Sequence, residues 1–223
     1  MSSPFQAIPI TERVFWVGAV DWGLREFHGY TTSRGTTYNA YLILADKITL
    51  VDAVKAPFTS ELLARVASVV DPERIDYVIS NHSEMDHSGG LPAVIQAVRP
   101  ERIFASKNGV KALADHFRLD GITAVGDGEQ LRLGNRTLTF LETKMLHWPD
   151  SMVSYLAEEQ LLFSQDAFGM HLADARMFAD LIPEAVLDWE AKKYFANILL
   201  PFSALILKAL DRVAALNLPL RII

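Results

Sequence analysis

Short apolar runs separated by polar residues occupy the first fifty positions of the chain. The runs contain β-branched and aromatic residues, which are typical of strands. They predict strands over residues 13–18, 38–44 and 47–51, with Ala45 and Asp46 as the turn between the last two. Residues 57–70 then place leucine and valine at helical spacing. We therefore expect a meander of strands covered by a helix.

The middle of the chain alternates between strand-like and helix-like segments. The pattern predicts strands over residues 75–80 and 102–105 and helices over residues 91–98 and 108–118. This alternation is typical of a β-α-β-α unit. A second β-rich half follows, with strands predicted over residues 130–133, 137–141, 151–156 and 160–163. The two β-rich regions imply two sheets.

The last part of the chain has a helical pattern from Leu187 to Leu216, interrupted at Pro201. The apolar run 218–223 follows it without a turn, a cap or a polar tail. We expect this run to be a strand that is cut where its loop should begin, so that the chain is truncated at its C-terminus. No repeat or linker marks a second domain. The pattern predicts one domain over residues 1–223.

Composition and charge narrow the class of protein. The chain has 223 residues, of which half are hydrophobic and 22% are charged, as expected for a globular domain. A net charge of −6 without a Lys/Arg cluster argues against binding to nucleic acid. No window reaches the roughly 18 apolar residues of a membrane span, and the N-terminus lacks the pattern of an export signal. We expect a cytoplasmic protein with no membrane partner.

The absence of cysteine restricts the chemistry further. It excludes disulfides, thiolate-bound zinc, cysteine-ligated iron–sulfur clusters and a cysteine nucleophile. Any metal ion must therefore be bound by histidine, aspartate and glutamate.

The loop of residues 81–90 is the strongest candidate for such a site. It follows the predicted strand 75–80 directly, and six consecutive positions contain four donors: His82, Glu84, Asp86 and His87. Two histidines with one carboxylate form a ligand set that suits non-haem iron. The alternative is a polar turn in which Ser88 or Asp86 caps the next helix, but a cap does not require four donors. The loop therefore predicts a metal site that two cations could share.

Two further donors follow strand-like runs. His147 comes after the predicted strand 137–141, and Asp166 comes after the predicted strand 160–163. Because strand ends on one edge of a sheet converge, we expect both side chains near the loop. On its own, His147 would be interpreted as an ordinary histidine near a loop.

Other conspicuous residues have simpler interpretations. We expect His116 to be an exposed helix residue and Asp150, next to Pro149, to serve in a turn. The aromatic residues expected in the core are Phe15, Trp16, Phe104 and Phe140.

The order His-x-Glu-x-Asp-His, followed by His147 and Asp166, resembles the diiron site of flavodiiron proteins. The resemblance extends through residues 20–30, 34–43 and 163–171 and covers nearly the whole chain. It implies a metallo-β-lactamase-like fold, which is a four-layer αββα sandwich of the α/β (α+β) class. It also implies a diiron domain whose flavodoxin-like partner domain, with FMN, is absent from this chain.

Carried over by position, the resemblance implies which iron each of these residues binds. One iron is bound by His82, Glu84 and His147, the second is bound by Asp86 and His87, and Asp166 bridges the two. One more histidine of the family falls beyond Ile223. Related zinc hydrolases have histidine where this chain has Glu84, and a harder oxygen donor favours iron.

The resemblance also implies an activity, which is reduction of O2 to water or of NO to N2O. Electrons come from FMN, supplied by a donor such as rubredoxin or a reduced flavin system, within a head-to-tail homodimer. His28, Tyr30 and His171 lie in the family-like segments and are predicted to be catalytic residues that donate a hydrogen bond or a proton. Without the flavin domain, the chain alone is not expected to turn over.

Two other functions remain open at this point. One is a binuclear zinc hydrolase of the same fold, which uses a metal-bound hydroxide. The other is a noncatalytic docking module with a degenerate site. The sequence does not decide between O2 and NO as the substrate.

Overall fold

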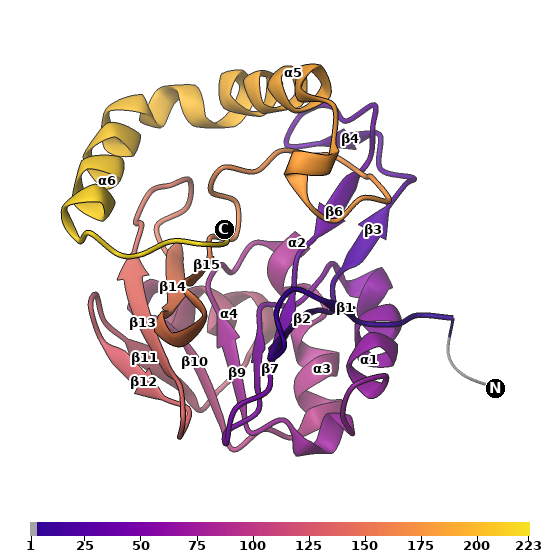
Figure 1. The fold of residues 1–223 in the computed structure, drawn as a ribbon, viewed down its shortest axis with the longest axis vertical. Coiled ribbons are helices and arrows are strands. Elements are labelled where there is room, and N and C mark those ends of the chain that lie inside the picture. The colour runs from indigo at the N-terminus through magenta and orange to yellow at the C-terminus, as the bar shows by residue number, and fades with distance from the viewer. Residues whose placement is uncertain (1–3) are drawn as a thin grey trace.

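A seven-stranded mixed sheet forms the centre of the computed structural model, which describes residues 4–223 (Figure 1). In spatial order its strands are β1 (Ile8–Pro9), β2 (Val14–Trp16), β7 (Tyr41–Ile43), β8 (Thr49–Val51), β9 (Tyr77–Ser80), β10 (Arg102–Ser106) and β11 (Ile122–Val125). The first four are antiparallel neighbours, and β8 to β11 pair in parallel. The carboxyl ends of β8, β9 and β10 therefore lie at one edge of the sheet.

A second, antiparallel sheet packs against the first. It consists of β12 (Gln130–Arg132), β13 (Thr137–Glu142), β14 (Met152–Leu156) and β15 (Leu161–Phe163). Two short pairs lie outside both sheets, β3 (Ala19–Asp21) with β6 (Thr36–Tyr38) and β4 (Glu26–Phe27) with β5 (Tyr30–Thr31). These pairs extend from the end of the molecule that carries the loops after β9 and β15 (Figure 1).

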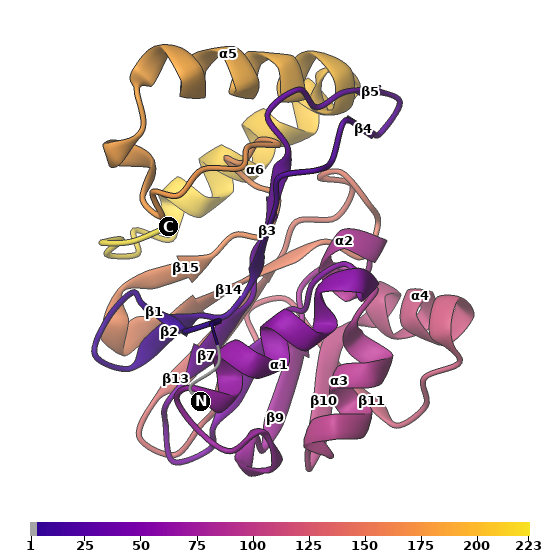
Figure 2. The ribbon, with the colours of Figure 1, turned by 90° about the vertical axis from the view of Figure 1, so that its right-hand side faces the viewer.

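Helices cover the outer face of the large sheet. They are α1 (Thr59–Ala67), the short α2 (Met85–Ser88), α3 (Leu91–Val98) and α4 (Lys107–Phe117). Near the C-terminus, α5 (Glu184–Tyr194), a π-helical segment (Phe195–Leu199) and α6 (Ser203–Ala215) form an arch over the end of the molecule that carries the β4–β5 pair (Figures 1 and 2). Single 3-10 turns occupy Ala56–Phe58, Pro72–Arg74, Ala157–Glu159, Ala179–Leu181 and Leu200–Phe202.

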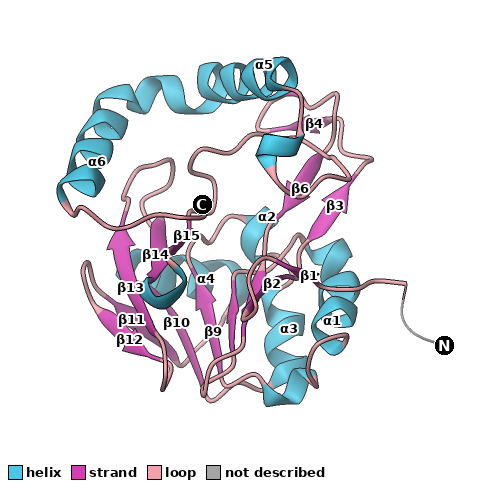
Figure 3. Ribbon diagram, in the orientation of Figure 1, coloured by secondary structure: helices cyan, strands magenta, loops and turns pink. Residues whose placement is uncertain are grey.

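Alternating side chains on the central strands separate two cores. Leu50 and Val78 are fully buried against the helices, whereas their neighbours Val51 and Ile79 are fully buried against the second sheet. This alternation follows from the period of two in a strand. The outer face of the second sheet is apolar as well, and it faces α5 and α6. The layers are thus helix, sheet, sheet and helix (Figure 3), which confirms the predicted αββα sandwich.

Most predicted elements are present, and the structure differs from the prediction at several places. The predicted strand 38–44 is divided between β6 and β7, because residues 36–38 pair with β3 while residues 41–43 pair with β2. Strand β11 and the short strands β1, β3, β4 and β5 were not predicted. The terminal run 218–223 is not a strand, since only Ile222 forms a bridge, to Leu161. The last helical region begins at Glu184 rather than Leu187, and its interruption at Pro201 is confirmed. Among the described residues, none of the helices is long and apolar enough to cross a membrane.

Candidate metal centre

The loop that follows β9 is held in place by a buried aspartate. Asp52, at the end of β8, is 3% exposed and adopts a φ of 59°. Its Oδ1 accepts the Asn81 backbone N–H at 2.6 Å, and its Oδ2 accepts the Asn81 side-chain amide at 3.0 Å. The Asn81 carbonyl oxygen Oδ1 in turn accepts the Ser154 hydroxyl of the second sheet at 3.0 Å. The start of the loop is therefore fixed to both sheets.

The six predicted metal ligands converge at the carboxyl edge of the large sheet. They form two groups, His82, Glu84, His147 and Asp166 in one and Asp86, His87 and Asp166 in the other. Within each group, the donor atoms lie within 4.8 Å of one another. Because Asp166 belongs to both groups, its two carboxylate oxygens can serve two neighbouring ions.

The first group has spacings that suit a coordinated ion. His147 Nε2 lies 3.2 Å from Glu84 Oε2 and 3.3 Å from Asp166 Oδ2. His82 Nε2 lies 3.3 Å from each of the same two oxygens. Zinc binds such donors at about 2.0–2.2 Å, so neighbouring ligands of one ion are about 3 Å apart. His147 Nε2 and Asp166 Oδ2 are buried without a hydrogen-bond partner, as expected of atoms that face a cation.

The second group has fewer donors. His87 Nε2 lies 2.8 Å from Asp166 Oδ1 and 3.6 Å from Asp86 Oδ2. The other Asp86 oxygen, Oδ1, is buried without a partner. Three donors leave coordination positions for another ligand or a substrate.

Without a bound cation, the imidazoles of His87 and His147 are protonated at neutral pH. Burial lowers the pKa of His87, but the Asp86 and Asp166 carboxylates outweigh burial and raise it to about 9. Burial likewise opposes protonation of His147, while the nearby Asp166 and Glu84 carboxylates raise its pKa to about 9. Burial raises the pKa of Asp166, yet the surrounding imidazoles hold it well below its usual range. A divalent ion replaces these protons, since metal ligation requires neutral imidazoles.

Asp150 is part of the site, so its interpretation as a turn residue was incomplete. It is 1% exposed. Its Oδ2 accepts the Ser83 backbone N–H at 2.6 Å and faces His82 Nδ1 at 3.2 Å. A carboxylate on Nδ1 directs His82 Nε2 toward the metal and increases its basicity. A Pro-Asp pair in the sequence gives no signal for this contact.

The three predicted catalytic residues lie together beside the first group. His28 Nε2 is 2.6 Å from Glu84 Oε1, and His28 Nδ1 is 3.2 Å from His171 Nε2. His171 Nδ1 then lies 3.0 Å from Thr36 Oγ1. The Tyr30 ring is 5.8 Å from the His171 ring, and its hydroxyl is buried without a partner. Thr36, His171 and His28 thus form a hydrogen-bonded series that ends at Glu84.

Tyr194 on α5 belongs to the same surroundings but was not predicted. It is 3% exposed, its ring centroid lies 5.4 Å from that of His171, and its hydroxyl has no partner. Burial is the main cause of its raised pKa, and Asp166, Asp86 and Glu84 add to it. In sequence, an aromatic residue in a helix is indistinguishable from a core residue. Trp148 contacts the site from the other side, with its ring 5.5 Å from that of His82.

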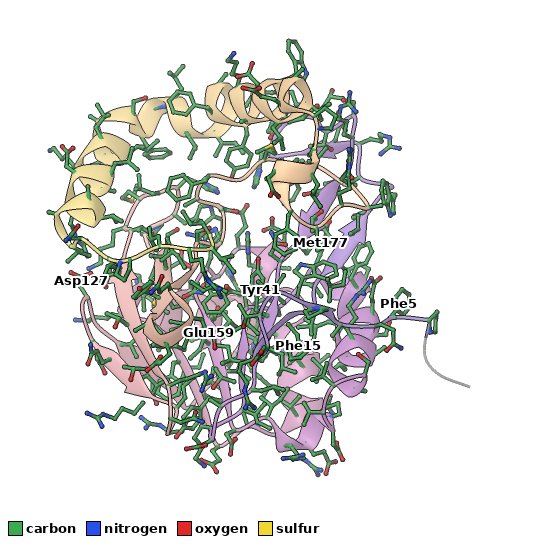
Figure 4. The ribbon with its side chains drawn as sticks, in the orientation of Figure 1. Phe5, Phe15, Tyr41, Asp127, Glu159 and Met177 are labelled. Atoms are coloured by element: carbon green, nitrogen blue, oxygen red, sulfur yellow. The ribbon has the colours of Figure 1, made fainter. Side chains whose placement is uncertain are left out.

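Two cavities border the metal centre. The first has a volume of about 470 Å³ and is almost entirely apolar. It extends from Asp166 and Tyr194 to Ile206, Ala209 and Val213 on α6. The second cavity, of about 380 Å³, is more polar. Its lining includes Asp52, Tyr41 and Met177. Met177 lies above Tyr41 in Figure 4. The first cavity can admit a small uncharged molecule.

Comparisons with known proteins agree on one family. A family model described as "ODP family beta lactamase" matches residues 36–222. The chain is 50% identical over 209 residues to the rubredoxin-oxygen oxidoreductase of Megalodesulfovibrio gigas, covering 92% of this chain and 52% of that protein. It is 46% identical over 222 residues to the nitric oxide reductase of Moorella thermoacetica, covering 98% and 56%.

A solved structure shares the fold over the full chain. The flavodiiron protein of Giardia intestinalis is similar with a TM-score of 0.93 and 36% identity, covering 100% of this chain and 55% of that one. The chain spans about half the length of the curated relatives it matches.

Proposed function

Because its residues 36–222 match the family model, the chain belongs to the ODP family of β-lactamase-like proteins, and we propose that it is the diiron domain of a flavodiiron oxidoreductase. The domain spans residues 1–223. The complete protein reduces O2 to water, NO to N2O, or both. The names of the relatives support both reactions, since one is a rubredoxin-oxygen oxidoreductase and another a nitric oxide reductase.

The sharing of Asp166 by two adjacent donor groups is the observation that carries this proposal. His82, Glu84 and His147 would hold one iron, Asp86 and His87 would hold the other, and Asp166 would contribute to both. When bound, a reduced pair of irons would supply two electrons to a diatomic molecule. The mixed oxygen and nitrogen donors suit iron.

The surrounding residues can supply the protons that O2 or NO takes up during its reduction. His28 donates a hydrogen bond to Glu84 and faces the first group, so it is placed to supply a proton. His171 positions His28, and Tyr30 adds a phenol at the same wall. The apolar cavity next to Asp166 can accept an uncharged substrate.

The diiron domain receives its electrons from a flavin. The flavin is FMN in a flavodoxin-like domain, and a small redox protein of the rubredoxin class reduces it, as the name of one relative suggests. A head-to-tail homodimer places the flavin of one subunit beside the irons of the other. We place the protein in the cytoplasm.

The decisive experiment is anaerobic reduction of the iron-loaded full-length protein, followed by separate mixing with O2 and with NO. We expect consumption of O2 without accumulation of peroxide and conversion of NO to N2O. Stoichiometric zinc together with hydrolysis of an ester, thioester or lactam would instead assign the protein to the binuclear hydrolases.

A further inference from the structure

The inner face of α5 buries a carboxylate that the metal centre does not use. Glu190 is 1% exposed, and Tyr194, one helical turn later, is 3% exposed. Residues four positions apart are neighbours on one helix face, so Glu190 and Tyr194 lie on the same face of α5. Figures 1 and 2 show α5 above the β4–β5 pair, which carries His28 and Tyr30.

Glu190 has ionic neighbours but no hydrogen bond. Lys193 Nζ lies 2.5 Å from Oε2, and Arg34 Nε lies 3.5 Å from Oε1. The Arg34 side chain is 53% exposed and the Lys193 side chain 20% exposed, so both connect the carboxylate to solvent. Neither Glu190 oxygen makes a hydrogen bond to another described group. Buried polar atoms in this condition are commonly satisfied by ordered water molecules.

On the inner side, a series of polar groups continues toward the metal centre. The hydroxyls of Tyr194 and Tyr30 are both buried without a partner. Tyr194 contacts the His171 ring, His171 contacts His28, and His28 contacts Glu84 at 2.6 Å. Hydrogen bonds join the imidazoles to each other and to Glu84, whereas Glu190 and the two phenols would have to be joined to one another and to the imidazoles by water molecules.

We infer that Glu190 is a proton-relay residue, which takes protons at the solvent side of α5 and passes them to the phenols and imidazoles beside the metal centre. This inference rests on the proposed function. Reduction of O2 by four electrons from reduced flavin consumes four protons and yields two waters. Reduction of two NO by two electrons consumes two protons and yields N2O and one water. Because the site is buried, these protons need a polar route from solvent.

The competing explanation is that Glu190 only attaches α5 to the loop that contains Arg34. A structural ion pair needs both partners, whereas a relay needs the carboxylate itself. The variant Arg34→Gln removes the pair and retains the carboxylate. The variant Glu190→Gln removes the exchangeable proton and retains nearly the same shape.

The kinetic test compares these variants with wild type as iron-loaded full-length proteins that contain the flavin domain, reduced anaerobically and mixed with O2 in a stopped-flow instrument. For Glu190→Gln we expect turnover slower by a factor on the order of 100, with an increased solvent isotope effect. Arg34→Gln should keep a rate near that of wild type. Asp188→Asn is the matched control, because Asp188 lies on the same helix, is 56% exposed and pairs with Lys192 at 2.6 Å. Wild-type turnover in Glu190→Gln, or an equal loss in Arg34→Gln, would overturn the relay.

Iron content and thermal unfolding are measured for every variant. If Glu190→Gln fails to fold, Glu190→Asp replaces it, and the relay predicts slower turnover that a small added weak acid restores. A structural role predicts no such restoration.

A readout without turnover decides the inference even if wild type reduces neither gas. A high-resolution crystal structure of the iron-free protein should contain ordered water joining a Glu190 oxygen to the hydroxyl of Tyr194 or Tyr30. A dry, closed gap between these atoms would overturn the inference and leave the diiron function untouched.

Discussion

Removal of the Asp150 carboxylate should weaken iron binding although Asp150 touches no metal. The Asp150 oxygen Oδ2 serves both the Ser83 N–H and His82 Nδ1. Loss of such a partner of a ligating histidine reduces metal affinity about 10–100-fold, which corresponds to about 1.4–2.8 kcal/mol. Asp150→Asn keeps an acceptor oxygen and loses only the charge, so we expect the lower limit. Asp150→Ala loses both, so we expect the upper limit.

The alanine variant should also be less stable. It leaves the buried Ser83 N–H without an acceptor, which costs about 1–3 kcal/mol in the free energy of unfolding. Iron affinity is measured anaerobically by competition with a chelator, and stability by urea unfolding of the iron-free protein. Asp115→Asn, an exposed aspartate on α4, is the control. If Asp150→Ala is folded and binds iron as tightly as wild type, Asp150 does not orient His82 and the reasoning is refuted.

Three further predictions concern the bridge, a buried acid and a glycine. Asp166→Ala removes a donor from both groups, so iron analysis should find no loaded pair, and a variant that retains two irons would remove the assignment of the bridge. Burial raises the pKa of Asp52 from 3.8 to about 6, so the native state binds its proton more tightly than the unfolded chain and stability falls as the pH rises from about 4 to about 6. In Asp52→Asn, the decrease in the free energy of unfolding between about pH 4 and pH 6 should be smaller by roughly 3 kcal/mol. The same pH dependence in wild type and variant, measured by urea unfolding, would contradict this prediction. Gly90→Ala should lower the free energy of unfolding by about 1–3 kcal/mol in a thermal melt, since its Cβ would lie 2.5 Å from Thr59 Oγ1, whereas Gly126→Ala, whose nearest atom is 3.6 Å away, should be neutral.

The metal donors could be predicted because they follow strand ends. The loop of residues 81–90 comes directly after β9, and Asp166 follows β15, so two sheets that pack face to face bring them together. The β-rich patterns also predicted two sheets. These features depend on residues close in sequence and on a simple rule of sheet geometry.

The residues around the donors could not be predicted in the same way. Asp150 reaches His82 only because the turn at residues 148–151 packs on the loop after β9, a contact across 68 positions. Tyr194 and Glu190 face the centre because α5 folds back over it, and helical periodicity does not show what a helix covers. The division of residues 38–44 likewise depends on pairing with distant strands, since an apolar run does not indicate where it changes sheets.

The central claim is that six carboxylate and imidazole groups bind a coupled pair of irons. Mössbauer spectroscopy of protein loaded anaerobically with ⁵⁷Fe and then oxidised tests it most directly, together with metal analysis. The account predicts two iron ions per chain whose spins are coupled through the bridging position at Asp166. A single uncoupled iron, or zinc retained in preference to iron, would contradict it.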